Sequence, residues 1–337
     1  MPFTKNSQYH DNTEISTYKE CPRKYFIRHV LGWTISMGED DCGDTDTRRA
    51  PALVFGSCWH AGMDAIWGAG PDCHPEDRRE LATVAFKKEW EENNYEYNLS
   101  LEDAATLGAR TPGVANEMYY NYIDQRSRML QEANVLGIEQ PIAMPFPGLS
   151  DTWYVGKLDK VVDYNGIHIL EHKTTTLYRI NGNFDTDYLE SWNAASQVKG
   201  YQMVGSLYYP DLQDVWVDCA LVHKKVHDAF RFVPISHSWN LLEEWITDTR
   251  RWISNMTEER QQWEHNGRVL KDGNFRRNED NCYGKYSKCP FLNICSTCSD
   301  PSILKEPPAG YIGQRWEPFD VLKLEKLIET GDSNGNS

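Results

Sequence analysis

The stretch GKLDKVVDYNGIHILEHKTTT, residues 156–176, joins a mostly apolar strand pattern to an abrupt run of charge. Residues 167–170 lead directly into Glu171, His172 and Lys173. Side chains alternate along a strand, so Glu171 and Lys173 share one face while His172 faces the other way. A carboxylate that binds Mg²⁺ or Mn²⁺ beside a lysine is suited to phosphodiester hydrolysis. The same residues could instead be exposed to solvent at the edge of a hairpin, without a catalytic role.

The turn in this stretch decides whether Asp159 joins the two charged residues. A two-residue Asn165-Gly166 turn would place Asp159 opposite His172 and send the two carboxylates to opposite faces. A three-residue loop with Gly166 in the left-handed position would set Asp159 against Glu171. An active site therefore requires an odd-length loop or a bulge. The isolated pattern is short, and its residue types are common.

Length and composition describe a globular chain with ordinary core capacity. The chain has 337 residues, 40% hydrophobic and 25% charged, with a formal net charge of −15. That charge argues against a protein that coats nucleic acid without sequence preference, but it allows an enzyme with a local basic groove. There is no apolar run of membrane-spanning length, and the first eleven residues are polar. We therefore expect a cytoplasmic protein with no membrane partner.

Periodicity predicts a mixed α/β protein whose N-terminal half is rich in helices. Asn12 or Thr13 is the expected N-cap of the first helix. Residues 38–49 are expected to be a loop and residues 330–337 a polar tail. Helical patterns cover 15–31, 53–67, 75–93, 111–133, 187–207 and 239–263, and strand patterns cover 135–147, 153–176, 215–223 and 229–235.

Four of the nine cysteines fall close together near the C-terminus, at Cys282, Cys289, Cys295 and Cys298. A disulfide framework is hard to reconcile with a chain expected in a reducing compartment. Clustered thiols point to metal binding instead. On residue chemistry, these four thiolates could hold zinc in a tetrahedral site.

Three further segments occur in order around the hairpin. They are STYKECPRKY at 16–25, FGSCWH at 55–60 and QVKGY at 197–201. Together with the D…ExK stretch, they resemble the PD-(D/E)XK nuclease superfamily, in particular its RecB-like, AddB-type branch with a C-terminal iron–sulfur cysteine cluster. The resemblance covers residues 14–298. It implies a restriction-endonuclease-like mixed sheet flanked by helices, with an iron–sulfur clasp joining the two ends of the chain.

The resemblance also implies roles for single residues. It implies catalytic roles for Asp159, Glu171, Lys173, Gln197 and Tyr201. It implies that His60, Asp159 and Glu171 hold Mg²⁺ or Mn²⁺. Taken alone, His60 could be an ordinary helix histidine, and Gln197 and Tyr201, four residues apart, could simply pack on one helix face. His172 is expected to be structural.

For the cysteines, the resemblance implies a [4Fe-4S] cluster held by Cys21, Cys282, Cys289 and Cys295. The six residues between Cys282 and Cys289 depart from the commoner two-residue spacing of the family, so Cys282 and Cys298 remain alternatives, and Zn²⁺ remains the alternative cofactor. The other cysteines are expected to be unliganded; they are Cys42, Cys58, Cys73 and Cys219.

These features predict a metal-dependent DNA nuclease, most simply an exonuclease on DNA ends or single strands in recombination or repair, and a phage or mobile-element origin also fits. The alternative is a catalytically inactive nuclease-fold protein that binds DNA or a partner and is stabilised by its metal cluster. A zinc-stabilised interaction protein is a third reading. The predicted division is a helical part at 1–134, a nuclease core at 135–265, a cysteine cluster at 266–305 and a tail at 306–337. The sequence does not identify a recombination partner protein.

Overall fold

A computed structural model describes residues 4, 7–35, 38–39, 45–46, 50–179, 182–271, 273–284, 288–322 and 324. The chain forms two compact units, each built from separate segments. The first unit comprises residues 1–47, 143–156 and 243–337, and the second comprises 48–142 and 157–242. Strands β5 (Asn134–Pro145) and β6 (Thr152–Asp163) contribute residues to both units.

The sheet of the second unit is mixed. The C-terminal part of β6 pairs antiparallel with β7 (Ile167–Thr175), β7 pairs parallel with β10 (Leu212–Leu221), and β10 pairs antiparallel with β11 (Phe230–Ile235). Val161, Ile169, Leu170, Val215 and Val217 are fully buried. Strands covered on both faces are rich in apolar residues, and these strands contain the buried apolar stretches 161–162 and 169–170. The predicted mixed α/β core flanked by helices is confirmed.

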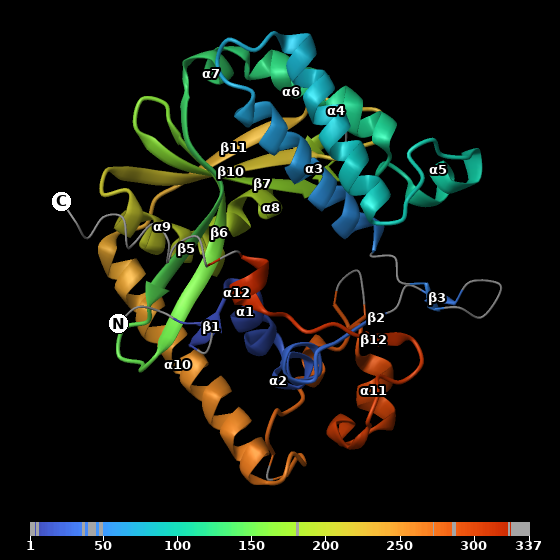
Figure 1. Ribbon diagram of the computed structural model, residues 1–337, viewed down its shortest axis with the longest axis vertical. Coiled ribbons are helices and arrows are strands. Elements are labelled where there is room, and N and C mark those ends of the chain that lie inside the picture. Colours follow the sequence, from blue (N-terminus) through green and yellow to red (C-terminus); the bar gives the residue numbers. More distant parts are fainter. Residues whose placement is uncertain are drawn as a thin grey trace. The chain divides into compact units, whose positions relative to one another are not determined.

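Helices cover both faces of this sheet. Helices α3 (Pro51–Gly68), α4 (Pro75–Glu92) and α6 (Pro112–Gln125) share one hydrophobic core with Leu170 of β7 (Figure 1). Helix α9 (Ser196–Tyr208) lies on the opposite face, where a Cβ atom at Gly205 would come within 2.6 Å of the Ile169 side chain. The shorter helices of this unit are α5 (Leu101–Leu107), α7 (Ser127–Glu132) and α8 (Thr186–Ser191).

The β6–β7 hairpin has the three-residue loop that an active site requires. Asp163 pairs with Ile167, and the pairing continues to Lys160 and Leu170. Asn165 has φ 58°, while Gly166 has φ 134°. The predicted positive φ of Gly166 is therefore confirmed, but Asn165 takes the left-handed position that we had expected for the glycine.

In the first unit, the segment predicted as one helix over 15–31 breaks at Cys21. Helix α1 (Asn12–Glu20) ends there, and Cys21 has extended backbone angles, φ −164° and ψ 114°. The cause is Pro22 at the start of α2 (Pro22–Tyr25), because proline disfavours a helical conformation at the preceding residue. A π-helical turn follows at Phe26–Val30. The N-cap of α1 is Asp11, whose side chain accepts a bond from the Glu14 amide, so the predicted caps were wrong.

The rest of the first unit joins the N-terminal segment to the C-terminal one. Strand β1 (Gln8–His10) pairs parallel with the start of β6, and β2 (Trp33–Ile35) pairs with β12 (Tyr311–Gly313). The long helix α10 (Trp239–His265) matches the pattern at 239–263. Aromatic stacking between Phe26 and Phe275, with ring centroids 4.7 Å apart, fills the interior. The remaining short elements are β3 (Gly38–Glu39), β4 (Thr45–Asp46), α11 (Leu292–Thr297) and α12 (Pro318–Val321) in this unit, and β8 (Tyr178–Arg179) and β9 (Asn183–Phe184) in the second unit.

Other boundaries differ modestly from the sequence patterns. The pattern at 187–207 divides at Ala195, whose extended backbone separates α9 from the preceding turns, and the pattern at 111–133 divides at Arg126. Residues 38–49 contain the short β3–β4 pair, and the rest of that predicted loop, including Cys42, lies outside the described residues. The tail at 330–337 also lies outside them, and the four-part division of the chain stays a prediction. None of the described helices is both long and apolar enough to cross a membrane.

Candidate functional site

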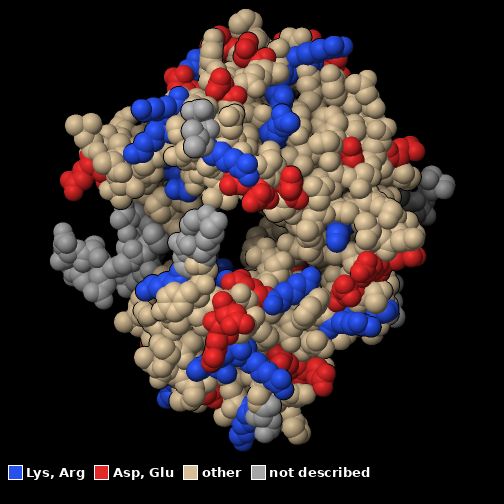
Figure 2. Space-filling view, turned by 180° about the vertical axis from the view of Figure 1, so that it is seen from behind, with Lys and Arg blue, Asp and Glu red and all other residues tan. Residues whose placement is uncertain are grey.

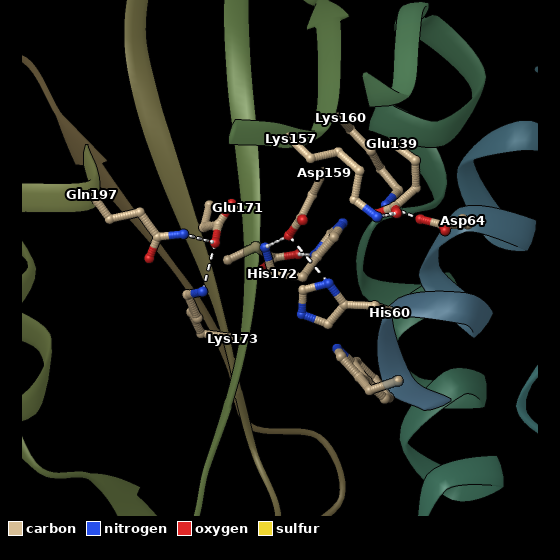
Figure 3. A network of polar contacts seen from close by, with 12 residues as sticks. His60, Asp64, Glu139, Lys157, Asp159, Lys160, Glu171, His172, Lys173 and Gln197 are labelled. Atoms are coloured by element: carbon tan, nitrogen blue, oxygen red, sulfur yellow. Dashed lines mark hydrogen bonds and ion pairs between the residues drawn. The ribbon is translucent and has the colours of Figure 1, made fainter. Parts of the chain in front are cut away.

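The charged end of β7 faces helix α9. Lys173 Nζ lies 2.5 Å from Glu171 Oε1, and Gln197 Nε2 donates to the same oxygen over 2.9 Å (Figure 3). Gln197 Nε2 also lies 2.8 Å from the Tyr201 hydroxyl. The other carboxylate oxygen, Glu171 Oε2, is buried and has no hydrogen-bond partner among the described residues. The structure therefore brings together four of the residues predicted for catalysis.

Asp159 lies beside this group, at the end of the hairpin pairing. Its Oδ2 accepts a hydrogen bond of 2.8 Å from the His172 amide and lies 3.3 Å from His60 Nδ1 (Figure 3). Burial would raise the pKa of Asp159, but His60, Lys160 and Lys173 together hold it well below its ordinary value. Asp159 is therefore an anion at neutral pH.

Opposite effects act on Glu171 and Lys173. Burial and the neighbouring Asp159 charge raise the pKa of Glu171 to about 7, although Lys173 opposes the shift. Burial disfavours the charged form of Lys173, but Glu171 and Asp159 raise its pKa above the ordinary value. At neutral pH the site therefore holds a lysine cation against a carboxyl group that is close to its titration point.

A second acidic residue, not predicted from the sequence, completes a group of possible metal ligands. His60, Glu139 and Asp159 place one donor atom each within 4.8 Å of the others. Glu139 lies on β5 with φ 49°, an uncommon backbone angle for a residue other than glycine, and its carboxylate pairs with Lys157. A nitrogen and two carboxylate oxygens form a donor set that suits Mg²⁺ or Mn²⁺. No motif marks Glu139, because its neighbours at 60 and 159 are distant in sequence.

A buried lysine lies next to this group. Lys160 is fully buried, and its Nζ lies 2.6 Å from Asp64 Oδ1. Asp64 is one helical turn after His60 on α3, so both side chains point from the same helix face toward β6 (Figure 3). A buried ammonium needs such a partner. Neither residue had been singled out from the sequence.

His172 faces away from Glu171 and Lys173, toward α3 and α6, and belongs to a buried polar network. Its Nδ1 lies 3.1 Å from Asp218 Oδ2, which also accepts a 2.7 Å bond from the Tyr122 hydroxyl. Burial and the nearby Lys160 charge lower the pKa of His172 to about 4, so the ring is neutral at pH 7. The His172 and His60 rings meet edge to face with centroids 6.2 Å apart.

Of the three residues predicted to hold the metal, two are in the group of possible ligands. His60 and Asp159 belong to it, whereas Glu171 is bonded to Lys173 and Gln197. The Asp159 charge nevertheless acts on Glu171, and Glu171 Oε2 remains without a partner in the described part of the chain.

The cysteines predicted to hold a cluster meet within the first unit. The Cys21 and Cys282 thiols act on the pKa of Cys289, and the Cys289 and Cys21 thiols act on that of Cys295. Burial raises the pKa of Cys295 to about 11, against the lowering effect of Arg23 and Arg277. The Asn278 amide donates to Cys21 Sγ over 3.3 Å.

Hydrogen bonds also fasten the N-terminal helices to the cysteine segment. The Arg23 guanidinium donates to the carbonyl oxygens of Phe275 and Ser299 over 2.9 and 2.7 Å. The side chains of Asn278 and Asn281 donate to the Glu20 carbonyl. These bonds hold the backbone on both sides of Cys21 near the segment that carries the other cysteines.

Comparison with known proteins matches the chain to a protein family and to solved structures. The family model of the PD-(D/E)XK nuclease superfamily matches residues 12–296. A search of curated proteins gave no match. Among solved structures, a candidate exonuclease from Eubacterium rectale is 16% identical, with 87% of this chain and 94% of that chain covered and a TM-score of 0.45. The protein SSO0001 is 11% identical, with 56% and 74% covered and a TM-score of 0.24.

Proposed function

The chain belongs to the PD-(D/E)XK nuclease superfamily, and from this premise we propose that it is a metal-dependent deoxyribonuclease that acts as an exonuclease on DNA ends or single strands. The observation that carries the proposal is the position of Asp159, which lies between His60 on one side and the Glu171–Lys173 pair on the other (Figure 3). A decorated hairpin edge would be solvated, whereas Asp159 and Glu171 are 5% and 2% exposed.

The residues present fit a Mg²⁺ or Mn²⁺ ion. His60, Glu139 and Asp159 would hold it, and the unpartnered Glu171 Oε2 is a further candidate oxygen. Burying several carboxylates together is unfavourable unless cations compensate them. When bound, the ion supplies Lewis acidity toward the scissile phosphate and lowers the pKa of water.

The chain's own residues then have distinct tasks. Lys173, held as a cation by Glu171 and Asp159, would stabilise the negative charge that develops on the phosphate during cleavage. Gln197 fixes the Glu171 carboxylate and is itself held at the Tyr201 hydroxyl, so both act as positioning residues. Because the lysine is already protonated in this arrangement, we assign it an electrostatic role and not that of a general base.

DNA as the substrate rests on the superfamily, and the distribution of charge bears on how DNA would bind. Figure 2 shows Lys and Arg interspersed with Asp and Glu over one face of the molecule, without a continuous positive surface among the described residues of that face. Such a surface does not favour binding along a DNA backbone at many phosphates. It agrees with local recognition near an end or a single strand, in a role in recombination or repair.

We also propose a [4Fe-4S] cluster on Cys21, Cys282, Cys289 and Cys295. The effects of Cys21 and Cys282 on the pKa of Cys289, and of Cys289 and Cys21 on that of Cys295, support the proximity of the four thiols, and Arg23 and Arg277 would favour the ionised form of Cys295. A tetrahedral zinc site would hold its sulfurs about 3.8 Å apart, from Zn–S bonds of about 2.3 Å. A [4Fe-4S] cluster would hold its four thiolates farther apart than a single zinc ion would. Its role would be structural, because hydrolysis transfers no electrons.

The proposal is tested with anaerobically purified protein and DNA labelled at the 5′ or 3′ end. Linear single strands, linear duplexes and circular single strands would each be incubated with Mg²⁺, Mn²⁺ or EDTA. We expect metal-dependent release of short products from linear DNA, with circular single strands left intact because they have no ends. Cleavage of circles would contradict the exonuclease assignment, and absence of metal-dependent cleavage of all substrates would contradict the nuclease assignment.

A further inference from the structure

We infer that His172 is a positioning residue for the metal-binding group, held in place by Asp218 and Tyr122 on the face of the sheet that α3 and α6 cover. The inference rests on the proposed function, since it assigns a role toward the same site. Its starting point is that His172 contacts two of the possible metal ligands at once. Its amide donates to Asp159 Oδ2 over 2.8 Å, and its ring lies against the His60 ring.

The hydrogen bond to Asp218 fixes both the orientation of the His172 ring and the nitrogen that carries its proton. Asp218 Oδ2, 3.1 Å from His172 Nδ1, is a carboxylate oxygen and can only accept, so Nδ1 carries the hydrogen. The same oxygen accepts from the Tyr122 hydroxyl, which in turn lies 3.3 Å from Trp67 Nε1. The side chains of His172 and Asp218 are 0% and 2% exposed. This network therefore has one arrangement, set by α3, α6 and β10.

The arrangement has an unfavourable feature that packing alone does not explain. His172 Nε2 is buried without a hydrogen-bond partner among the described residues, and so is Asp218 Oδ1. Arg126 compensates the Asp218 charge only loosely, at 3.9 Å. Apolar residues at both 172 and 218 would avoid both defects. A histidine here is explained if its task is to orient His60, as carboxylate-bound groups behind metal ligands generally do.

The same strand provides a matched pair that lacks these contacts. His168 lies four residues earlier on β7, and its Nδ1 is 2.5 Å from Asp214 Oδ1 on β10. The two histidine–aspartate pairs lie in the same register between β7 and β10, with Asp214 beside His168 and Asp218 beside His172. His168 stacks on Trp216 at 4.2 Å, and no contact with His60 or Asp159 is found for it in the described chain. The two pairs therefore contain the same residue types, but among the described residues only the His172 pair contacts possible metal ligands.

The test compares Mn²⁺ binding by calorimetry in H172N and D218N with binding in H168N and D214N. We expect the first two to bind Mn²⁺ about 10- to 100-fold more weakly than wild type, the range for residues that support a metal ligand. The second two should bind as wild type does, although every substitution should lower the melting temperature. A purely structural role would lower stability in all four and leave affinity unchanged.

The Y122F variant keeps the test valid if D218N does not fold, because it removes one hydroxyl and no charge. It should weaken Mn²⁺ binding in the same direction, by a smaller factor. Equal affinity in H172N, Y122F and H168N would overturn the inference, whatever the nuclease activity. If wild type binds Mn²⁺ but cleaves no DNA, the proposed function fails while the positioning role stands. If wild type binds no Mn²⁺, both are wrong.

Discussion

Replacing Lys173 with methionine separates the chemistry of the site from its capacity to bind metal. Methionine keeps much of the side-chain volume and cannot carry the charge. In the structure, Lys173 Nζ contacts Glu171 Oε1 at 2.5 Å, whereas the group of possible metal ligands consists of His60, Glu139 and Asp159. The substitution should therefore lower the rate of cleavage strongly and leave Mn²⁺ affinity close to that of wild type.

The expected size of the effect follows from two consequences of losing the ammonium group. Losing one charge-stabilising donor in an active site lowers kcat by about 10²- to 10³-fold. Because Lys173 opposes the raised pKa of Glu171, its loss raises that pKa further above about 7 and leaves a neutral carboxyl at pH 7. Breaking a buried pair costs about 3 kcal/mol or more. The proton taken up by Glu171 should keep the cost near that lower figure.

The measurements are kcat on end-labelled DNA, Mn²⁺ affinity by calorimetry, and the free energy of unfolding in urea. Lys199→Met is the matched control, because Lys199 lies on the same helix as Gln197 and makes no hydrogen bond or ion pair with Glu171 in the described part of the chain. The control should retain both cleavage and Mn²⁺ binding. The reasoning is refuted if K173M cleaves DNA at the wild-type rate, or if it loses Mn²⁺ affinity together with activity.

Three further predictions concern other parts of the molecule. With EDTA present, the free energy of unfolding should fall by up to about 3 kcal/mol between pH 5 and pH 8. The pKa of Glu171 in the folded protein, about 7, lies above its ordinary value of 4.5, so in this range the folded protein binds a proton that the unfolded chain does not. Urea unfolding should show this pH dependence in wild type and not in E171Q. E139Q should weaken Mn²⁺ binding measured by calorimetry, and unchanged affinity would remove Glu139 from the site. Freshly purified protein should be brown, with broad absorbance near ~400 nm. The C21A variant should lose iron and colour, whereas C298A should keep both. A colourless protein that contains zinc, and whose zinc content does not change in C21A, would disprove the cluster.

The hairpin shows what local sequence can predict. The charged residues after an apolar strand required an odd loop, and the observed pairing of Asp163 with Ile167 provides it. The alternation of a strand also predicted that Glu171 and Lys173 share a face. The prediction failed only in which turn residue is left-handed, because asparagine is one of the few residues besides glycine that adopt that conformation.

The second part of the site could not be predicted, because it depends on contacts between distant segments. Glu139 reaches His60 and Asp159 only after β5 and α3 have come together. Asp218 is one of many acidic residues until β10 places it beside His172. No periodicity or spacing connects such positions, so a single sequence carries no signal for them.

The division of the chain into segments has a consequence for its synthesis. The second unit is complete once residue 242 has been made, whereas the first unit needs its last segment, beginning at residue 243. At about 5 to 20 residues per second, Cys21 is made on the order of 10 to 50 s before Cys282. During that interval Tyr25 and Phe26, 1% and 0% exposed in the finished protein, lack their partner Phe275. A growing chain that has not yet reached residue 275 therefore contains all the residues of the carboxylate site while the apolar side chains of its N-terminal helices still lack this partner.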